Sequence, residues 1–220
     1  MNIYISIGAQ CTTATLFDRL QVKNKSLPFD WMFSTPQFVY TILKLLIEQK
    51  QIEDIIDNHF FVCDKRAVLK EVEHHILTEN GPVLVNSKYN VCFPHDTMES
   101  RDKYIRRLER LKQLIFNKDI FLYFIYISVS SPNSGNYTLD GLEPIQEVYE
   151  YIEKINSILK DIRSNYKILI FHTNKPPEVI PLDMVHIRHY DIKQKNSSRE
   201  LLPELVDKCK KLIESRVIRK

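Results

Sequence analysis

Glycine and cysteine are both scarce in this chain, which has four residues of each type among 220. So few glycines leave Gly8 isolated, and the sequence has no glycine-rich dinucleotide fingerprint. The polar stretch after Val129 lacks the lysine and the spacing of a Walker phosphate loop. The four cysteines have no Cys-x-x-Cys spacing and are too sparse for a disulfide scaffold, which argues against a paired-cysteine zinc site. We therefore expect reduced thiols, a cytoplasmic location, and neither a metal nor a cofactor.

Long hydrophobic runs and a strong charge imbalance are also missing. The longest apolar run, residues 120–129, is well short of the roughly 20 residues that a membrane span needs. No positive segment precedes the first apolar run, so we expect no signal peptide. The net charge is +3, and acidic and basic residues alternate along most expected helices. We expect neither a membrane nor a nucleic acid as a partner.

Strand and helix patterns alternate along most of the chain. Buried or half-buried strands are predicted at residues 3–7, 120–129, 167–171 and 184–190, and helices at residues 11–20, 36–47, 98–116, 144–162 and 200–215. This order predicts an α/β fold, a three-layer sandwich with a mainly parallel central sheet. We expect a single domain over residues 1–220, with a long polar loop at residues 130–141.

A smaller unit is expected as an insertion between residues 34 and 96. Ser34 or Thr35 can cap the helix that begins at Pro36. Residues 51–80 are polar and predict short helices, one of them over residues 65–77. Residues 83–85 and 91–93 predict a small β-hairpin.

Cys11 is the first candidate for chemistry, because it follows a short strand and Gly8 and stands at the start of a predicted helix. The unpaired N–H groups and the positive dipole at a helix start stabilise a thiolate. First-turn amides near Thr12 and Thr13, with Gln10 beside them, could hold an oxyanion. A buried structural cysteine is the alternative interpretation.

A nucleophilic thiol needs a base, and the sequence offers seven histidines. His95 follows a strand and a proline and is adjacent to Asp96, which could orient its ring. His172 ends a buried strand, where α/β folds often place ligands. We favour His95 and keep His172 as the alternative base.

Two further features carry charge. Asp30 lies between Phe29 and Trp31, so it is expected to be partly buried and to need a donor, unless it only forms an Asx turn. The helix at 98–116 is rich in basic residues and could grip an anion. Acidic neighbours on the same helix make a solvated face with helical ion pairs the simpler interpretation.

Four motifs together resemble one known family. They are Ile5-Ser-Ile-Gly-Ala-Gln-Cys11, Pro28-Phe-Asp-Trp31, Phe93-Pro-His-Asp96 and Lys103-Tyr-Ile-Arg-Arg-Leu-Glu-Arg110. In this order, over roughly the first 130 residues, they resemble bacterial and large-DNA-virus proteins described as papain-like cysteine peptidases. A viral member would act in the host cytoplasm.

The resemblance implies that Cys11 is the nucleophile and His95 the base, with Asp96 or Asp30 orienting the histidine. It also implies supporting roles for Trp31 and for the basic helix, where Arg106, Arg107 and Arg110 could brace the acid of the aromatic motif. One feature departs from papain, whose nucleophile helix packs against an antiparallel sheet. A cysteine at a strand-to-helix turn is closer to the serine position of α/β esterases.

The sequence therefore predicts a thiol-dependent hydrolase that forms an acyl-enzyme on Cys11, with a peptide or another acyl compound as substrate. An esterase or acyltransferase is the nearest alternative. A non-catalytic binding or host-interaction module that uses the N-terminal turn and the basic helix is the second. A sugar- or nucleotide-linked transferase using the loop after Val129 is the third. The oligomeric state does not follow from the sequence.

Overall fold

The computed structural model describes most of the chain. It covers residues 1–8, 12–23, 25–61, 65–67, 83–86, 88–89, 91–93, 95–128, 145–172, 186–191, 203 and 206–211. Gln10, Cys11, the predicted loop at 130–141, residues 68–77 and most of the last predicted helix lie outside the described residues. Thr12 and His172 are described by their backbone alone.

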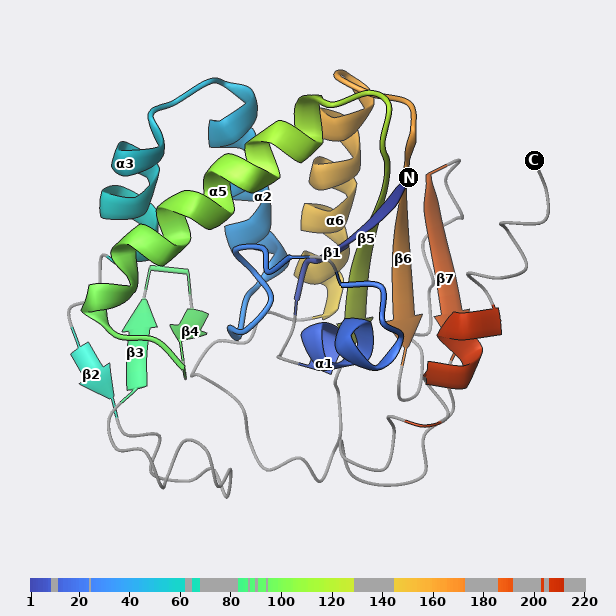
Figure 1. The fold of residues 1–220 in the computed structure, drawn as a ribbon, viewed down its shortest axis with the longest axis horizontal. Coiled ribbons are helices and arrows are strands. Elements are labelled where there is room, and N and C mark those ends of the chain that lie inside the picture. Colours follow the sequence, from blue (N-terminus) through green and yellow to red (C-terminus); the bar gives the residue numbers. More distant parts are fainter. Residues whose placement is uncertain are drawn as a thin grey trace.

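A parallel sheet of four strands forms the centre of the described fold (Figure 1). Its strands, in spatial order, are β1 (Asn2–Ser6), β5 (Phe121–Ser128), β6 (Tyr166–His172) and β7 (Ile187–Asp191). All three neighbouring pairs run parallel, as near-continuous apolar strands covered on both faces do. The predicted α/β fold with a mainly parallel sheet is confirmed.

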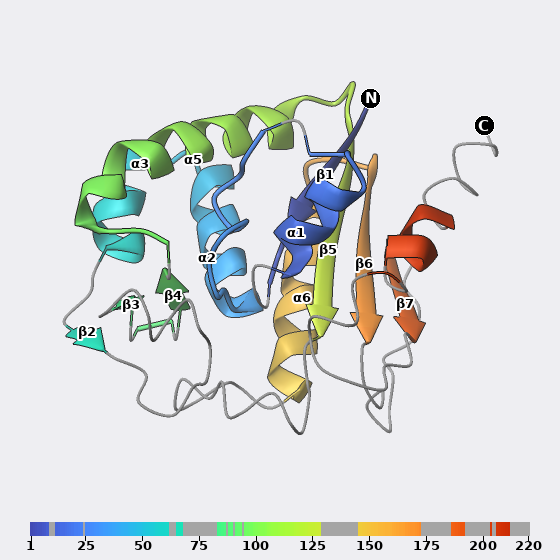
Figure 2. The same cartoon turned by 60° about the horizontal axis from the view of Figure 1, so that its bottom comes forward.

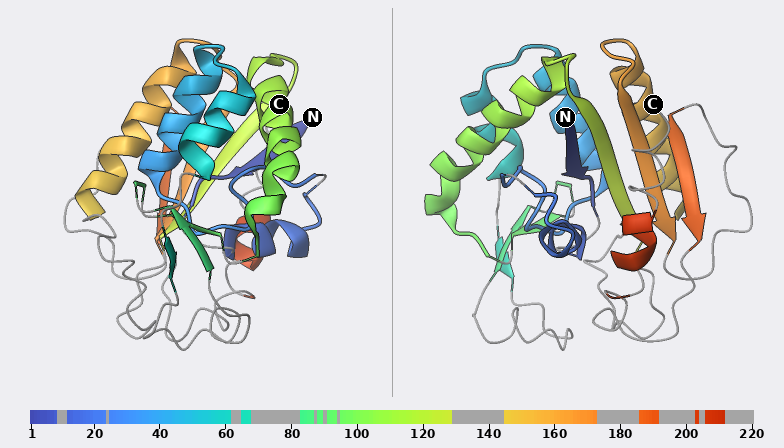
Figure 3. Two further views of the ribbon diagram at one scale, coloured as in Figure 1. Left: turned by 90° about the vertical axis from the view of Figure 1, so that its left-hand side faces the viewer. Right: turned by 45° about the vertical axis from the view of Figure 1, so that its right-hand side comes forward.

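Helices cover both faces of this sheet, which makes three layers (Figures 2 and 3). α1 (Thr12–Arg19) and the helical segment 206–211 lie on one face, and α2 (Pro36–Ile47) and α6 (Ile145–Lys160) lie on the other. Alternate side chains of β5 supply the two cores: Ile125 and Ile127 pack with Phe17 of α1, and Phe124 joins the larger core with α2 and α6. This alternation follows from the two-residue period of a strand.

The smaller unit inserted after α2 contains both helices and strands. α3 (Ile52–Ile55) continues as the π-helical turn η1 (Ile56–Phe60), and the turn η2 (Met98–Ser100) leads into α5 (Arg101–Phe116). Between them β2 (Lys65–Ala67), β3 (Val83–Asn86) and β4 (Val91–Phe93) form an antiparallel sheet. The predicted hairpin is confirmed as β3 and β4.

The prediction of a helix from residue 65 is wrong at its start, because residues 65–67 form strand β2. The three residues Lys-Arg-Ala carry no strand pattern of their own. They pair with β3, as in Arg66 opposite Leu84, and this non-local pairing overrides the local preference.

The start of α2 matters for the site because it fixes the chain just before it. Thr35 caps the helix: its Oγ1 accepts from the N–H of Phe38 at 3.2 Å, and Pro36 follows in the first turn. The predicted cap is confirmed at Thr35. Ser34 immediately precedes this cap and is thereby held in place. No helix among the described residues is long and apolar enough to cross a membrane.

Candidate active site at the carboxyl end of strand β1

The turn between β1 and α1 is built around Gly8. The backbone of Gly8 has φ +130°, which L side chains rarely adopt. A Cβ on Gly8 would lie 3.1 Å from the Ser34 carbonyl oxygen and 3.1 Å from Cε2 of Tyr126. Thr13 Oγ1 donates to the Gly8 carbonyl oxygen at 3.0 Å and ties the first turn of α1 back to the strand. The residues between Gly8 and Thr12, Cys11 among them, therefore join two closely fixed ends.

Asp30 lies at the centre of a buried turn and is only 2 % exposed. Its Oδ2 accepts from the N–H of Leu27 at 2.8 Å and lies 3.4 Å from Nζ of Lys23. Burial raises the pKa of Asp30 above its usual value, and Lys23 and the Leu27 N–H partly offset that rise. The expected burial and the expected need for a donor are both confirmed.

Trp31 connects this turn to His95. The two rings meet edge to face with centroids 6.2 Å apart, and Nζ of Lys23 lies 4.5 Å from the centroid of the Trp31 ring. Two residues further on, Phe33 pairs through its backbone with Cys92 of β4, at 2.9 and 3.0 Å. The aromatic turn and the strand that precedes His95 are thus one packed unit.

His95 and Asp96 differ in their surroundings. The His95 side chain lies at the surface, and partial burial together with Lys103 lowers the pKa of its imidazole. Asp96 is buried; its Oδ2 accepts from the hydroxyl of Tyr104 at 2.8 Å, and its Oδ1 pairs with Nζ of Lys103. Both partners of Asp96 come from α5, so the carboxylate anchors the loop after β4 to that helix.

The basic helix α5 contributes one buried guanidinium. Arg107 is 9 % exposed, its Cζ lies 5.3 Å from the centroid of the Tyr104 ring, and its charge lowers the pKa of Asp30 in part. Its Nη1 is buried with no hydrogen-bond partner among the described residues. The expectation of a solvated basic face is therefore wrong for Arg107, because its side chain is buried and lies over the Tyr104 ring. Arg106 is exposed.

Arg110 braces the aromatic motif from a different direction. Its Nη1 donates to the carbonyl oxygen of Ser26 at 2.5 Å, which fixes the connection just before Leu27. At the start of the helix, Arg101 forms a bidentate pair with Asp57, whose oxygens lie 2.8 and 2.9 Å away. These are bonds between elements, in contrast to the expected ion pairs along the helix itself.

The four sequence motifs therefore meet in space although they span residues 5–110. The short segment 31–34 has Trp31 against His95 at one end and the Ser34 carbonyl against Gly8 at the other. Three residues of extended chain span at most about 11 Å, so the backbones of Trp31, whose ring contacts His95, and of Ser34, which adjoins Gly8, are no further apart than that.

The alternative base, His172, also lies at the carboxyl edge of the parallel sheet. It is the last residue of β6, and the register places it opposite Ser128 of β5 and Asp191 of β7. β6 is two strands away from β1, a separation of about 10 Å across the sheet. The backbone positions of His95 and His172 are both compatible with a role as the base.

Sequence reasoning missed three residues of this site: Lys23, Lys103 and Tyr104. Lys23 looks like part of a polar connector, and no local pattern pairs it with Asp30, seven residues later. Lys103 and Tyr104 stand inside the basic helix motif, and the sequence alone gives no sign that they bond Asp96. The family motif itself was the available signal, since both residues belong to it.

Comparison with known families identifies the family to which the chain belongs. The profile of a family described as "Putative papain-like cysteine peptidase (DUF1796)" matches residues 2–159. The chain belongs to this family. The match confirms the resemblance that the four motifs indicated, and it covers all of them. No curated protein and no solved structure matches the chain.

Proposed function

We propose that this family member is a thiol-dependent acyl hydrolase with Cys11 as its nucleophile. One observation carries the proposal: Trp31 contacts His95, and Ser34, three residues later, adjoins Gly8 at the carboxyl end of β1, just before Cys11 in the sequence. That end is where open parallel sheets place their ligands. The family description agrees with thiol chemistry.

The proposed reaction has two halves. A histidine takes the proton of the Cys11 thiol, and the sulfur attacks a substrate carbonyl carbon to form a tetrahedral intermediate. First-turn amides of α1, those of Thr12 and Thr13, hold the oxyanion. The histidine then protonates the leaving group, which departs and leaves an acyl-enzyme. Water, deprotonated by the same histidine, attacks this thioester and releases the acid and the thiol.

His95 is the base that we favour. The lowered pKa of its imidazole keeps the ring neutral at neutral pH, which is the form that accepts a proton. Its edge-to-face contact with Trp31 limits the orientations of the ring. In the proposal Asp30 and Asp96 hold the surrounding loops, because both carboxylates are already bonded to other groups.

We infer the class of bond that is cleaved from two grounds, the strand-to-helix position of Cys11 and the family description. A nucleophile between a parallel strand and a helix is the arrangement of α/β esterases, whereas papain places its helix against an antiparallel sheet. We therefore propose an acyl compound as substrate, with esters and thioesters included beside peptides.

Labelling of the thiols with iodoacetamide alkyne at pH 7, read out by peptide mapping, tests the nucleophile. We expect rapid labelling at Cys11 that Cys11→Ala abolishes, while the circular dichroism spectrum is unchanged. Cys92 and Cys209 are buried internal controls, and burial raises the pKa of the Cys209 thiol to about 12. Cys63→Ala is the matched control and should label like the wild type. Equal labelling of Cys11→Ala would remove Cys11 from the mechanism.

Replacement of each histidine separates the two candidate bases. We expect His95→Asn to slow the labelling of Cys11 at pH 7 by about a hundredfold, since general-base assistance contributes roughly that much or more. His172→Asn should leave the rate within about twofold. The reverse result would assign the base to His172 and retain Cys11.

A binding module is the second candidate function. The buried Nη1 of Arg107, which has no hydrogen-bond partner among the described residues, favours it, because such a group can hold an anion. Under this alternative Cys11 labels no faster than a free thiol in an unfolded peptide, and both histidine variants leave its labelling unchanged.

A further inference from the structure

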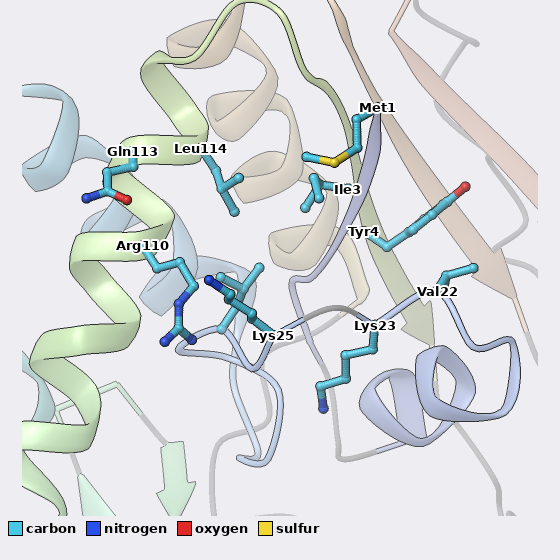
Figure 4. Close-up of a pocket in the computed structure, with 10 residues that line it drawn as sticks. Met1, Ile3, Tyr4, Val22, Lys23, Lys25, Arg110, Gln113 and Leu114 are labelled. Carbon is cyan, nitrogen blue, oxygen red and sulfur yellow. The ribbon is translucent and has the colours of Figure 1, made fainter.

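A cavity of about 300 Å³ lies at the amino-terminal end of β1, away from the Gly8 turn (Figure 4). Its walls come from β1, from the connection at residues 22–27 and from α5. Ile3, which lines it, stands five residues before Gly8, a distance of about 16 Å along an extended strand. The cavity is therefore separate from the Gly8 turn, while Lys23, Leu27 and Arg110 connect it to the aromatic turn around Asp30.

Apolar side chains form one side of the cavity. Met1, just before β1, and Ile3 of β1 face Leu114 of α5, and Leu27 is a further apolar lining residue. Ile3 and Leu114 are only half-buried. An alkyl chain placed between them would cover this apolar surface and displace its water.

Cationic side chains form the other side. Lys25 and Arg110 both line the cavity, and in the view of Figure 4 their charged ends lie on the same side of it, apart from the apolar group of Met1, Ile3 and Leu114. Neither Lys25 nor Arg110 forms an ion pair with a described carboxylate, and none of the described lining residues is acidic. Lys23, the third cation, is already neutralised by Asp18 at 3.6 Å and Asp30 at 3.4 Å.

Two cations without a counter-ion next to an apolar wall favour an amphipathic anion. Like charges that gather at one place repel each other, and a bound anion removes that repulsion. Arg110 uses one N–H to hold the Ser26 carbonyl, and the remaining donors of its planar fork suit a carboxylate. Lys25 is exposed and adds a point charge at the rim.

We infer that this cavity binds a small carboxylate with an aliphatic body, its head between Lys25 and Arg110 and its chain against Ile3 and Leu114. A volume of about 300 Å³ is at the lower end for ligand pockets, so the body is short. The inference does not depend on the proposed hydrolase activity, because none of the four residues used takes part in the proposed proton transfer or nucleophilic attack; Arg110 in addition braces the aromatic motif.

Isothermal titration calorimetry of the full chain with octanoate tests this site. We expect octanoate to bind at least tenfold more tightly than 1-octanol, which lacks the charge, and than acetate, which lacks the chain. Lys25→Met should weaken octanoate about fivefold to tenfold through loss of one charge-assisted contact, and should leave 1-octanol unchanged. Higher salt should weaken octanoate in the wild type.

Lys50→Met is the matched control, because Lys50 is an exposed lysine that does not line the cavity. It should bind octanoate like the wild type. Methyl NMR signals of Ile3 and Leu114 should shift on titration, while that of Leu84 in the antiparallel sheet should not. Undetectable octanoate binding at millimolar concentration, or equal binding by wild type and Lys25→Met, would overturn the inference. Unchanged octanoate binding by Cys11→Ala would show that the two sites are separate.

Discussion

Two groups of charged residues in the molecule differ in how they are paired. The carboxylates of the candidate site, Asp30 and Asp96, are buried, and each has a cation and a hydrogen-bond donor as partners. At the amino end of β1, Lys25 and Arg110 line a cavity with no described acid paired to them. The two carboxylates are neutralised within the protein, whereas the two cations are presented to a ligand.

This difference indicates which groups build the fold and which are available for binding. A buried carboxylate with bonded partners costs free energy to disturb, so Asp30 and Asp96 fix the aromatic turn and the loop after β4. An exposed cation without a partner contributes little to folding and can serve a ligand. Substitutions that disturb the candidate site should therefore change stability and thiol reactivity together.

The largest effect is expected from Gly8→Ala. The new Cβ would require a backbone conformation that alanine avoids and would meet the Ser34 carbonyl, which cannot rotate away. We expect a loss of about 3–5 kcal/mol in the free energy of unfolding, the sum of backbone strain and overpacking. Urea unfolding measures this loss, and the labelling rate of Cys11 should fall with it.

Ile7→Val is the positional control for that substitution. It removes one buried methylene next to Gly8 without changing the turn, and it should cost only about 1 kcal/mol. If Gly8→Ala cost no more than Ile7→Val and labelled normally, the turn would not need a glycine.

Asp30→Ala should have the next largest effect, about 2–3 kcal/mol in the free energy of unfolding. It leaves the Leu27 N–H without its acceptor and Lys23, which is only 10 % exposed, without one of its two carboxylates. Asp30→Asn keeps an acceptor of the same shape and should cost less.

The pH dependence of Asp30 has a definite sign. Burial raises the pKa of the folded protein's Asp30 above the unfolded value of about 3.9, so the folded state holds this proton more tightly. The stability of the wild type relative to Asp30→Asn should therefore be greatest below about pH 4 and should fall as pH rises through the folded pKa. Urea unfolding of both proteins over this pH range measures it. A relative gain of the wild type on raising pH would mean that Lys23 outweighs burial.

Most of the parallel half of the fold was predictable from sequence. Runs such as residues 120–129 are apolar on both faces, and this pattern is typical of a strand that is covered on both sides of a parallel sheet. Strand β2 was not predictable, because Lys65–Ala67 has no β pattern and forms a strand only by pairing with β3. The local sequence preference of a segment predicts strands that bury their own apolar side chains. It does not predict a strand that forms only by pairing with a neighbouring strand.

The candidate site was predictable in part. The burial of Asp30 followed from its aromatic neighbours, which leave a carboxylate no access to water. The burial of Arg107 did not follow, since a basic helix with acidic residues is usually solvated, and only its low exposure in the fold and its contact with the Tyr104 ring show otherwise. Pairings across long sequence separations, such as Arg110 with the Ser26 carbonyl, come from the fold.

The smallest effect, and the one closest to the chemistry, concerns Lys103 and His95. The charge of Lys103 helps to lower the pKa of His95, so Lys103→Met should raise that pKa toward its usual value of about 6.5. Proton NMR titration of the ring measures it. If neutral His95 is the base, the acidic limb of the Cys11 labelling profile should move to higher pH in the same variant.

Lys103→Arg is the matched control, because it keeps the positive charge, and it should leave the pKa of His95 unchanged. A shift in Lys103→Arg as large as in Lys103→Met would trace the effect to the loss of the contact with Asp96, and the positive charge near His95 would then have no part in tuning the base.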